Sequence, residues 1–395
     1  MTRPAIPRGV WVLGFVSLLM DVSSEMIHSL LPLYLTVALG AGALVVGIIE
    51  GVAEATALIV KVFSGVLSDR WRNRKGLAAL GYGLGAFSKP FFALATGPGL
   101  VFAARFADRI GKGIRGAPRD ALIADLTPSA IRGAAFGLRQ SLDTIGAFVG
   151  PLLAMGLMLA WHDDFRAVFW VAVVPGVLSF LLIAFAVREP EANTSKAPLP
   201  PRLNAATVRA LGKPFAWVAI AGAALTLARF SEAFLVLRGR DLGLDLAYAP
   251  LVMVAMSVVY ALSAYPIGVL ADRMSKRTLL AWGAALLVVA DVVLAAASGL
   301  VALGIGVALW GLHMGATQGL LAAMVADAAP GNLRGTAFGV FNLASGIAML
   351  AASVIAGALW QFMGPAATFI TGAVFAALCT AIVKLRLPPP LDRST

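Results

Sequence analysis

Acidic and basic side chains recur at helical spacing inside long apolar stretches of this sequence. Asp21, Glu25 and His28 follow one another at i, i+4 and i+7, so a helix through this segment presents all three on one face. Burying a charge in apolar surroundings is unfavourable unless the charge is paired or lines a polar cavity. A carboxylate in such a cavity can take up and release protons, and we rank Glu25 first and Asp21 second for this role.

A second set of charges is mainly basic. Arg105, Asp108, Arg109 and Lys112 form one helical stripe, and Asp143 lies in the next apolar stretch. Facing stripes of acid and base predict a charge network in which Arg109 stabilises the ionised form of a nearby carboxylate. The candidates for proton coupling are Glu25, Asp21, Arg109 and Asp143. The candidates for lining a substrate cavity are His28, Glu50, Glu54, Arg105, Lys112, Arg139, Arg229, Glu232, His313 and Asn342.

Several of these residues have a competing structural interpretation. Glu50 and Glu54 are one turn apart and can reach a membrane interface or pair with a basic neighbour. Arg229 and Glu232, at i and i+3, can neutralise each other. A structural or snorkelling role is favoured for three further ionisable residues on apolar stretches, which are His313, Lys61 and Lys89.

The residue types needed for enzymatic chemistry are scattered. Three histidines, His28, His162 and His313, lie in separate segments, and Cys379 is the only cysteine, so no nucleophile with a base and no metal cluster is indicated. The glycine pair around Gly111–Gly113 lacks the Lys-Ser/Thr ending of a phosphate loop. We expect no enzymatic activity, no cofactor and no metal.

The composition indicates the elements that must position these charges. Hydrophobic residues make up 60% of the 395 residues and charged residues only 13%, which is too apolar for an ordinary soluble domain. We predict an all-α integral membrane protein, because many stretches are long enough to span about 30 Å of hydrocarbon. The twelve predicted transmembrane helices are 9–37, 42–68, 76–95, 98–125, 132–160, 165–187, 214–237, 246–270, 278–298, 300–326, 334–361 and 366–386.

The sequence contains an internal repeat. Arg132–Gly137 returns as Arg334–Gly339 at a spacing of 202 residues, and Gly65–Arg70 returns as Gly268–Arg273 at 203. Two similar halves are typical of secondary transporters. We therefore predict two pseudo-symmetric six-helix bundles, residues 1–187 and 214–395, joined by a polar, proline-bearing linker at 188–213.

The net charge of +11 indicates how the chain is oriented in the membrane. The basic residues of the sequence gather at the termini, in alternate loops and in the linker. By the positive-inside rule, this distribution predicts that both termini lie in the cytoplasm. We expect a multi-pass protein of the cytoplasmic (inner) membrane that contacts lipid and a small-molecule substrate, binds no nucleic acid and functions as a monomer.

Three motifs resemble those of the major facilitator superfamily. The first occurs twice, as Gly65, Asp69, Arg70, Arg74 and Lys75 and as Gly268, Asp272, Arg273, Lys276 and Arg277. The first copy departs from the family pattern by one extra residue within Trp71–Asn73. In the family this segment is a latch that holds the cytoplasmic side closed, so the resemblance implies a cytoplasmic gate.

The other two motifs lie in the fourth and fifth predicted helices. Arg109–Gly113 is similar to the family's Arg-x-x-Gln-Gly pattern, with Lys112 in place of glutamine. Gly146, Gly150 and Pro151 resemble the Gly-x-x-x-Gly-Pro pattern, which in the superfamily is associated with exporters that work by antiport. Apart from the family, two glycines one turn apart favour close helix packing, and proline removes a backbone donor.

These observations predict a secondary active transporter that works by alternating access around a mid-membrane cavity. The helix-five glycines and the buried carboxylates favour a proton-coupled efflux antiporter. The alternative is a proton-coupled uptake symporter for a small organic anion or metabolite, which the basic stripe at Arg105, Arg109 and Lys112 would suit. A membrane-embedded enzyme or sensor is the third and least favoured interpretation.

Overall fold

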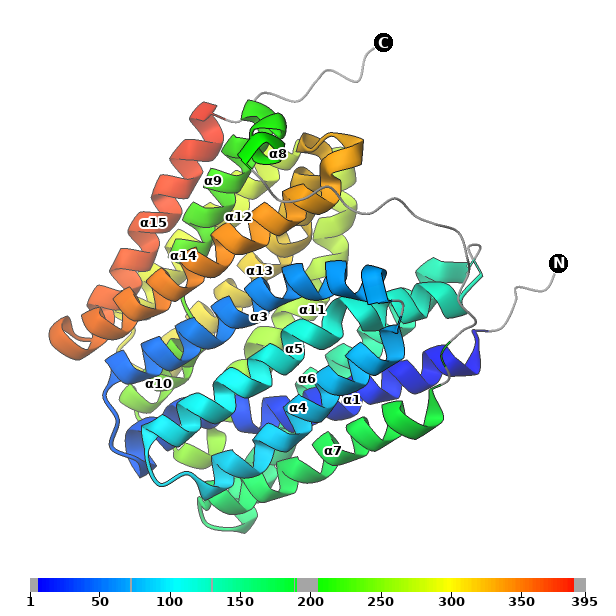
Figure 1. Ribbon diagram of the computed structural model, residues 1–395. Coiled ribbons are helices and arrows are strands. Elements are labelled where there is room, and N and C mark those ends of the chain that lie inside the picture. The colour runs from blue at the N-terminus through cyan, green and yellow to red at the C-terminus, as the bar shows by residue number, and fades with distance from the viewer. Residues whose placement is uncertain (1–5, 72, 129–130, 188, 190–204, 387–395) are drawn as a thin grey trace. The chain divides into compact units, whose positions relative to one another are not determined.

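The protein is all-helical in the computed structural model, which describes residues 6–71, 73–128, 131–187, 189 and 205–386 (Figure 1). The first half contains α1 Arg8–His28, α2 Leu31–Leu33, the π-helix η1 Tyr34–Ala38, α3 Ala43–Trp71, α4 Arg74–Leu94, α5 Pro98–Leu126, α6 Arg132–Ala160 and α7 Phe165–Ala186. The second half contains α8 Ala205–Ala210, α9 Gly212–Ala228, α10 Ala233–Asp241, the 3-10 helix η3 Leu246–Tyr248, α11 Pro250–Arg273, α12 Lys276–Ala296, α13 Leu300–Ala328, the 3-10 helix η4 Gly331–Leu333, α14 Arg334–Met363 and α15 Pro365–Arg386.

Eleven segments of the described chain are helical, long and apolar enough to cross a membrane. The fourth predicted span, α5, is not among them, because it carries a charged stripe along its length. It is nevertheless 29 residues long, and at 1.5 Å per residue it extends about 43 Å, more than the hydrocarbon thickness. On length, α5 supplies the twelfth helix of the predicted set.

Two predicted spans are interrupted rather than continuous. The first span is α-helical up to His28, and the short helix α2 starts beyond Ser29. Pro32 lies in the first turn of α2, where its missing backbone N–H is tolerated. The seventh breaks between α9 and α10, where the Oγ of Ser231 accepts a hydrogen bond from the backbone N–H of Ala233 at 3.3 Å. Such a cap satisfies a donor that a new helix would leave without a partner.

The chain divides into two compact units. Unit 1 comprises Met1–Gly40, Thr56–Leu199 and Leu246–Leu251, and unit 2 comprises Ala41–Ala55, Pro200–Asp245 and Val252–Thr395. The units differ from the sequence halves mainly at the start of α3, which belongs to unit 2. The predicted linker falls largely on residues 188 and 190–204, which lie outside the described part of the chain.

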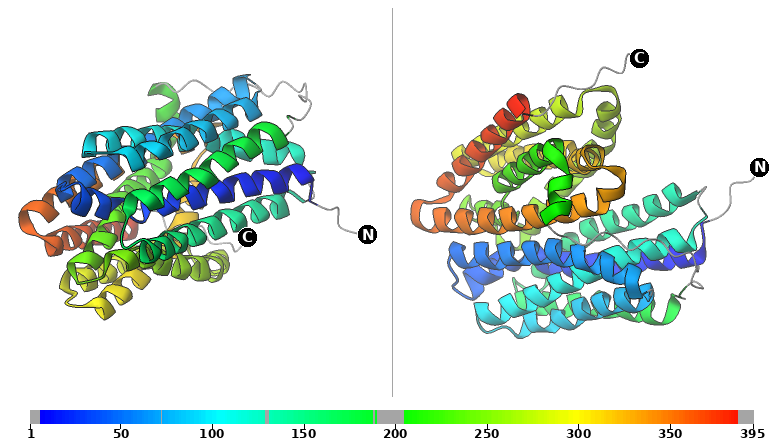
Figure 2. Two further views of the ribbon diagram at one scale, coloured as in Figure 1. Left: turned by 90° about the horizontal axis from the view of Figure 1, so that it is seen from below. Right: turned by 45° about the horizontal axis from the view of Figure 1, so that its top comes forward.

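Unit 1 is organised around α1. This helix packs against α6 and α7, while α4 packs against α5 and α7, and these neighbours run side by side in both further views (Figure 2). The apolar face of α1 supplies Val10, Leu13, Val16 and Met20 to a core that Tyr82 of α4 joins, and none of these five side chains is exposed. Polar side chains of α1 contact α4 and α5, through the hydrogen bonds of Ser24 with Lys89 and of Ser17 with Arg119.

Unit 2 is organised around α12, which packs against α13 and α15, and around α9, which packs against α14 and α15. Its centre is aromatic: the ring centroid of Phe230 lies 5.3 Å from that of Trp310 and 5.6 Å from that of Phe369. The start of α3 joins this unit through glycines, because a Cβ at Gly357 of α14 would lie 2.7 Å from the carbonyl oxygen of Ala43. Only glycine permits backbones to approach this closely.

Candidate functional site

A buried ion cluster joins α4 and α5 in unit 1. The Nζ of Lys89 lies 2.8 Å from Asp108 Oδ1, and Arg109 Nη2 lies 2.9 Å from Asp108 Oδ2. Each of the three residues is at most 2% exposed. One carboxylate thus pairs with two basic side chains, because each of its oxygens accepts from a different one.

The cluster extends to α1 and along α5. Lys89 also donates from Nζ to Ser24 Oγ at 2.9 Å, which ties the polar face of α1 to the cluster. Arg105 and Arg115 on α5 are buried as well, and Arg115 lies over the Tyr82 ring, 4.9 Å from its centroid. Aromatic faces attract cations. Buried basic groups therefore outnumber buried acids along this stripe.

A second, more accessible network lies between α5 and α6. Arg139 forms ion pairs with Asp143, one turn along α6, and with Asp120 of α5, to which its Nη1 lies at 3.3 Å. Arg119 lies 3.1 Å from Asp120 and 3.9 Å from Asp143. Two arginines and two aspartates therefore alternate around one junction of the two helices.

Arg119 connects this second network to α1 and α4. Its Nη1 donates to Ser17 Oγ at 3.0 Å, and Ser17 Oγ lies 3.0 Å from the hydroxyl of Tyr82. The polar face of α1 consequently meets both networks, through Ser24 at one level and through Ser17 about two turns earlier. A change of charge in one network can alter the other through α1.

The backbone of α1 and the Cβ atoms of its two acids pack against the glycines of α6. A Cβ at Gly146 would lie 3.0 Å from the Cβ of Asp21, and a Cβ at Gly150 would lie 2.9 Å from the Cβ of Glu25. The glycine pair is thus the surface on which α6 packs against Asp21 and Glu25, and we call these four residues the α1–α6 seam. Glu25 also contacts His28, with 3.4 Å between Oε2 and Nδ1.

The charges around the seam differ between its two ends. Among the charged neighbours of Asp21, the strongest influence is the like charge of Asp143. The charges that act on Glu25 are the bases His28, Lys112 and Arg109, in that order. Arg109 itself forms an ion pair with Asp108.

Unit 2 holds the remaining cavity candidates. They are Glu50, Glu54, Arg229, Glu232, His313 and Asn342. Glu50 is only 1% exposed, and Glu54 is half-buried. His313 is fully buried and its Nδ1 lies 2.7 Å from the carbonyl oxygen of Gly283, which agrees with a structural interpretation.

Sequence reasoning underrated two residues of the buried cluster. Lys89 does not snorkel to an interface, since its side chain is 2% exposed and bonded on both sides. Asp108 was recognised as part of the stripe but not as the shared counter-ion. The available signal was the position of Asp108 among several bases on one face. A buried carboxylate in such surroundings is expected to pair with the bases near it, including one from a neighbouring helix.

The gate motifs are described in part. The side chains of Asp69, Arg70, Asp272 and Arg273 lie outside the described residues. The basic residue that begins the next helix is described in each copy, Arg74 in α4 and Lys276 in α12. Arg74 pairs with Asp125 near the C-terminal end of α5. Lys276 pairs with Asp327 near the C-terminal end of α13, at 2.5 Å.

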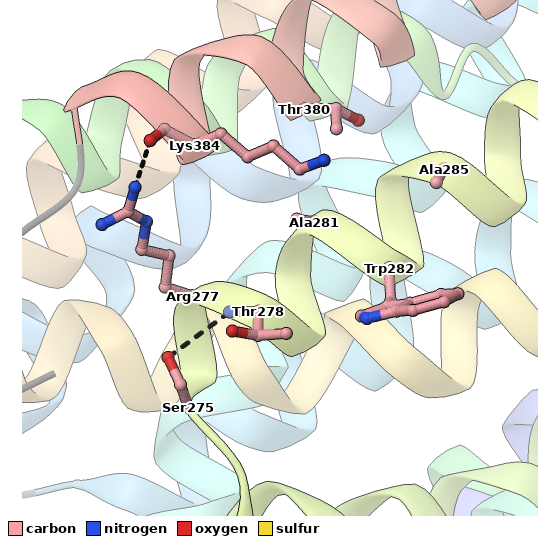
Figure 3. Close-up of a pocket in the computed structure, with 8 residues that line it drawn as sticks. All are labelled: Ser275, Arg277, Thr278, Ala281, Trp282, Ala285, Thr380 and Lys384. Carbon is pink, nitrogen blue, oxygen red and sulfur yellow. Dashed lines mark hydrogen bonds between the residues drawn. The ribbon is translucent and has the colours of Figure 1, made fainter. Parts of the chain in front are cut away.

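Two described cavities, one in each unit, lie away from the ion clusters. An open groove of about 440 Å³ in unit 2 lies between α12 and α15, and Figure 3 shows the side chains of Trp282, Thr380 and Lys384 along it. Arg277 at its rim donates to the backbone carbonyl of Lys384. A second cavity, of about 720 Å³ between α4 and α7, is apolar. Within the described residues no group of three or more His, Cys, Asp or Glu side chains could hold a metal ion.

Comparison with known proteins decides the family. The family model of the Major Facilitator Superfamily matches residues 13–237 and 218–395. The chain belongs to the major facilitator superfamily. It is a multi-pass membrane transporter of this family rather than an enzyme, and the superfamily fold predicted from the motifs is confirmed.

Two relatives illustrate the range of similarity within the superfamily. An uncharacterized MFS-type transporter, MJ1317 of Methanocaldococcus jannaschii, is 31% identical over 381 residues, which cover 94% of this chain and 93% of the relative. The multidrug resistance protein MdtH of Photorhabdus laumondii is 29% identical over 191 residues, which cover 48% of this chain and 47% of MdtH. The second similarity therefore concerns only about half of each protein.

Solved structures agree on the fold. The nucleoside transporter NupG superposes with a TM-score of 0.78 at 14% identity, covering 97% of this chain and all of that one. A bacterial homologue of the human lysosomal transporter Spinster superposes with a TM-score of 0.79 at 15% identity, covering 98% of this chain and 97% of that one. At such low identity the match concerns the fold alone.

Proposed function

We propose that this transporter is a proton-driven exporter, in which a carboxylate of α1 exchanges a proton for a small-molecule substrate. The observation that carries the proposal is the α1–α6 seam, where Asp21 and Glu25 pack directly against Gly146 and Gly150. A movement of α6 relative to α1 changes the surroundings of both acids at once, because no intervening side chain buffers the contact. Such a coupling of helix position to proton affinity is what antiport requires.

Asp21 is the better of the two proton carriers. Like-charged Asp143 is among the charges that act on it, together with Arg115, Lys112 and Arg119. Arg139 and Arg119 also contact Asp143. A movement of α6 that carries Asp143 therefore changes the charges around Asp21, so we propose Asp21 first and Glu25 second, the reverse of the ranking that the sequence suggested.

The export direction rests on two supports. The first is the glycine pattern of α6, the fifth predicted span. There Gly146, Gly150 and Pro151 resemble the pattern of antiporting exporters. The second is the similarity of about half of the chain to MdtH, whose name describes a multidrug resistance protein.

We also propose that the transporter lies in the inner membrane with both termini in the cytoplasm and that it acts as a monomer.

A second candidate function has an observation of its own. On the described α4 and α5 helices four basic residues, Lys89, Arg105, Arg109 and Arg115, are buried together with Asp108. Basic side chains inside a membrane protein suit the recognition of an anionic substrate. Proton-coupled uptake of a small organic anion is therefore the alternative, and the substrate's charge separates the two.

The decisive experiment measures proton exchange by the purified, detergent-solubilised full chain. Amphiphilic cations, neutral drugs and organic acids are added in turn while a dye reports the pH of a weakly buffered solution. The variants are Asp21→Asn and Glu25→Gln, and the matched control is Asp245→Asn, which changes an exposed acid of the same type.

The outcomes separate the proposals. Proton release on adding a cationic or neutral compound, lost in Asp21→Asn and kept in Asp245→Asn, supports export by antiport. Proton uptake on adding an organic acid supports the anion symporter. Binding of a compound with no proton movement in the native protein would contradict both, and release that survives in both α1 variants would contradict the role of the seam.

A further inference from the structure

One acid of unit 2 is buried without any visible neutralisation. Asp291 of α12 is 0% exposed, and neither Oδ1 nor Oδ2 has a hydrogen-bond partner among the described residues. An ionised carboxylate in this position is strongly disfavoured because it has lost water and gained no donor. The group therefore requires a bound cation or proton.

A glycine lets the carboxylate pack closely against α15. A Cβ at Gly372 of α15 would lie 2.6 Å from Asp291 Oδ2, so any larger residue would clash with the carboxylate. The same point is 3.2 Å from the carbonyl oxygen of Ala228 and 3.0 Å from the ring of Phe230. Ala228 is the last residue of α9, where a helix leaves carbonyl oxygens without intrahelical partners. A carboxylate oxygen and a helix-end carbonyl oxygen thus both lie within 3.2 Å of one point beside Gly372.

The internal repeat explains why this acid lacks a partner. Asp291 is 202 residues beyond Lys89, and α12 itself begins and ends 202 residues beyond α4. Lys89 is neutralised by Asp108 of the following helix, but the residue 202 beyond Asp108 is Trp310. Trp310 carries no charge, and its own Nε1 has no hydrogen-bond partner within the described chain. At these two positions the C-terminal copy therefore has a buried group of opposite type, an acid in place of a base, and no ionisable partner for it.

We propose that Asp291 is a binding site for a small monovalent cation, a proton or Na⁺, at the break between α9 and α10. A larger ligand does not fit, because the buried rings of Phe230, Trp310 and Phe369 fill the adjacent space. End-of-helix carbonyls beside a carboxylate are a recurrent way of binding driving ions in transporters. The site is separate from the α1–α6 seam and holds whichever direction the transporter works.

Other titratable groups on the helices packed around Asp291 have their own contacts or lie elsewhere. His313 of α13 bonds to Gly283, eight residues or about 12 Å along α12 from Asp291. Cys379 of α15 donates to the Ala221 carbonyl. The charged residues of the break itself are Arg229 and Glu232, so Arg229 is the basic group to be tested as a competitor for Asp291.

The test measures the thermal unfolding of the purified full chain in detergent. Native protein, Asp291→Asn and the exposed-acid control Asp245→Asn are compared over a pH series, in potassium and in sodium buffers of equal ionic strength. Asparagine has the shape of a protonated aspartic acid, so Asp291→Asn is expected to fold. If a proton occupies the site, the native unfolding temperature falls as the pH rises and that of Asp291→Asn does not.

The sodium series distinguishes the two ions. If Na⁺ occupies the site, sodium restores the native unfolding temperature at alkaline pH and has no such effect on Asp291→Asn. Either result supports the site, provided that Asp245→Asn behaves like the native protein. Identical pH and sodium responses of the native protein and Asp291→Asn overturn the proposal.

A second variant tests the geometry without removing the charge. Gly372→Ala fills the space beside Asp291, and we expect it to weaken sodium stabilisation by about tenfold in concentration or to move the midpoint of the pH response by about one unit. Gly304→Ala is the matched control, since a Cβ there meets nothing within 4 Å. A response that is unchanged in Gly372→Ala, or one that Arg229→Gln abolishes while Asp291→Asn retains it, contradicts the assignment to Asp291.

Discussion

The α4–α5 pair and the α12–α13 pair are two copies of one design with opposite interiors. Each helix of the second pair begins and ends 202 residues beyond its counterpart in the first. In the first pair Lys89, Asp108 and Arg109 form a buried ion cluster, whereas their counterparts are Asp291, Trp310 and Gly311. Helices of the same length and register therefore form with this ion cluster in one copy and without it in the other.

The largest expected effect comes from removing the shared counter-ion of the N-terminal pair. Asp108→Asn leaves Lys89 and Arg109 buried without their carboxylate, and breaking a buried ion pair in this way costs about 3–5 kcal/mol. We expect a large loss of folded yield and a lower unfolding temperature, measured by size-exclusion fluorescence after heating. The control Asp327→Asn, at an exposed acid of the C-terminal pair, should retain most of the native stability. Equal losses in the two variants would abolish the distinction between the pairs.

The α1–α6 seam gives the next largest effect. Gly150→Ala puts a Cβ within 2.9 Å of both the Glu25 Cβ and the Val22 carbonyl oxygen, and overpacking of this kind costs about 1–3 kcal/mol. We expect a reduced rate of transport in proteoliposomes together with a lower unfolding temperature. Gly156→Ala, on the same helix with nothing within 4 Å, should behave like the native protein. A fully active Gly150→Ala protein would show that the seam tolerates separation.

A smaller effect is expected from His313, the buried histidine of the C-terminal pair. His313→Leu removes the contact with the Gly283 carbonyl and should cost about 1 kcal/mol. His313→Asn can still donate to that carbonyl and should restore most of the loss, with transport unchanged. If His313→Asn is stable but loses proton coupling, then this histidine carries protons and the C-terminal pair takes part in coupling after all.

The smallest effects should be found where the two pairs are alike. Arg74→Gln and Lys276→Gln each remove one ion pair at a partly exposed end of the helix pair, and such pairs contribute less than about 1 kcal/mol. Parallel thermal unfolding measurements should give small and similar shifts. A loss several times larger at Arg74 would mean that its bond to the Ala121 carbonyl matters more than the ion pair.

The sequence predicted most helix positions because lipid-spanning stretches must be long and apolar. It did not predict the break at Arg229–Glu232, since the apolar character continues on both sides and the Ser231 cap has no separate signature. Helical phase put Asp21 and Glu25 on one face, but phase cannot tell which helix lies opposite. The buried pairing of Lys89 was missed for the same reason: a lysine near the end of an apolar stretch reads equally well as snorkelling.

The two copies differ in length by one residue in the turn that precedes Arg74 and Lys276. The preceding motif residues Asp69 and Asp272 are 203 positions apart, but Arg74 and Lys276 are 202 apart, so one codon was gained or lost in the short turn between them. From that turn to the start of α14 the two copies remain in register. Within these two helix pairs the copies differ by substitution alone. By contrast, α3 has 29 residues and α11 has 24, so the helices before the turn differ in length.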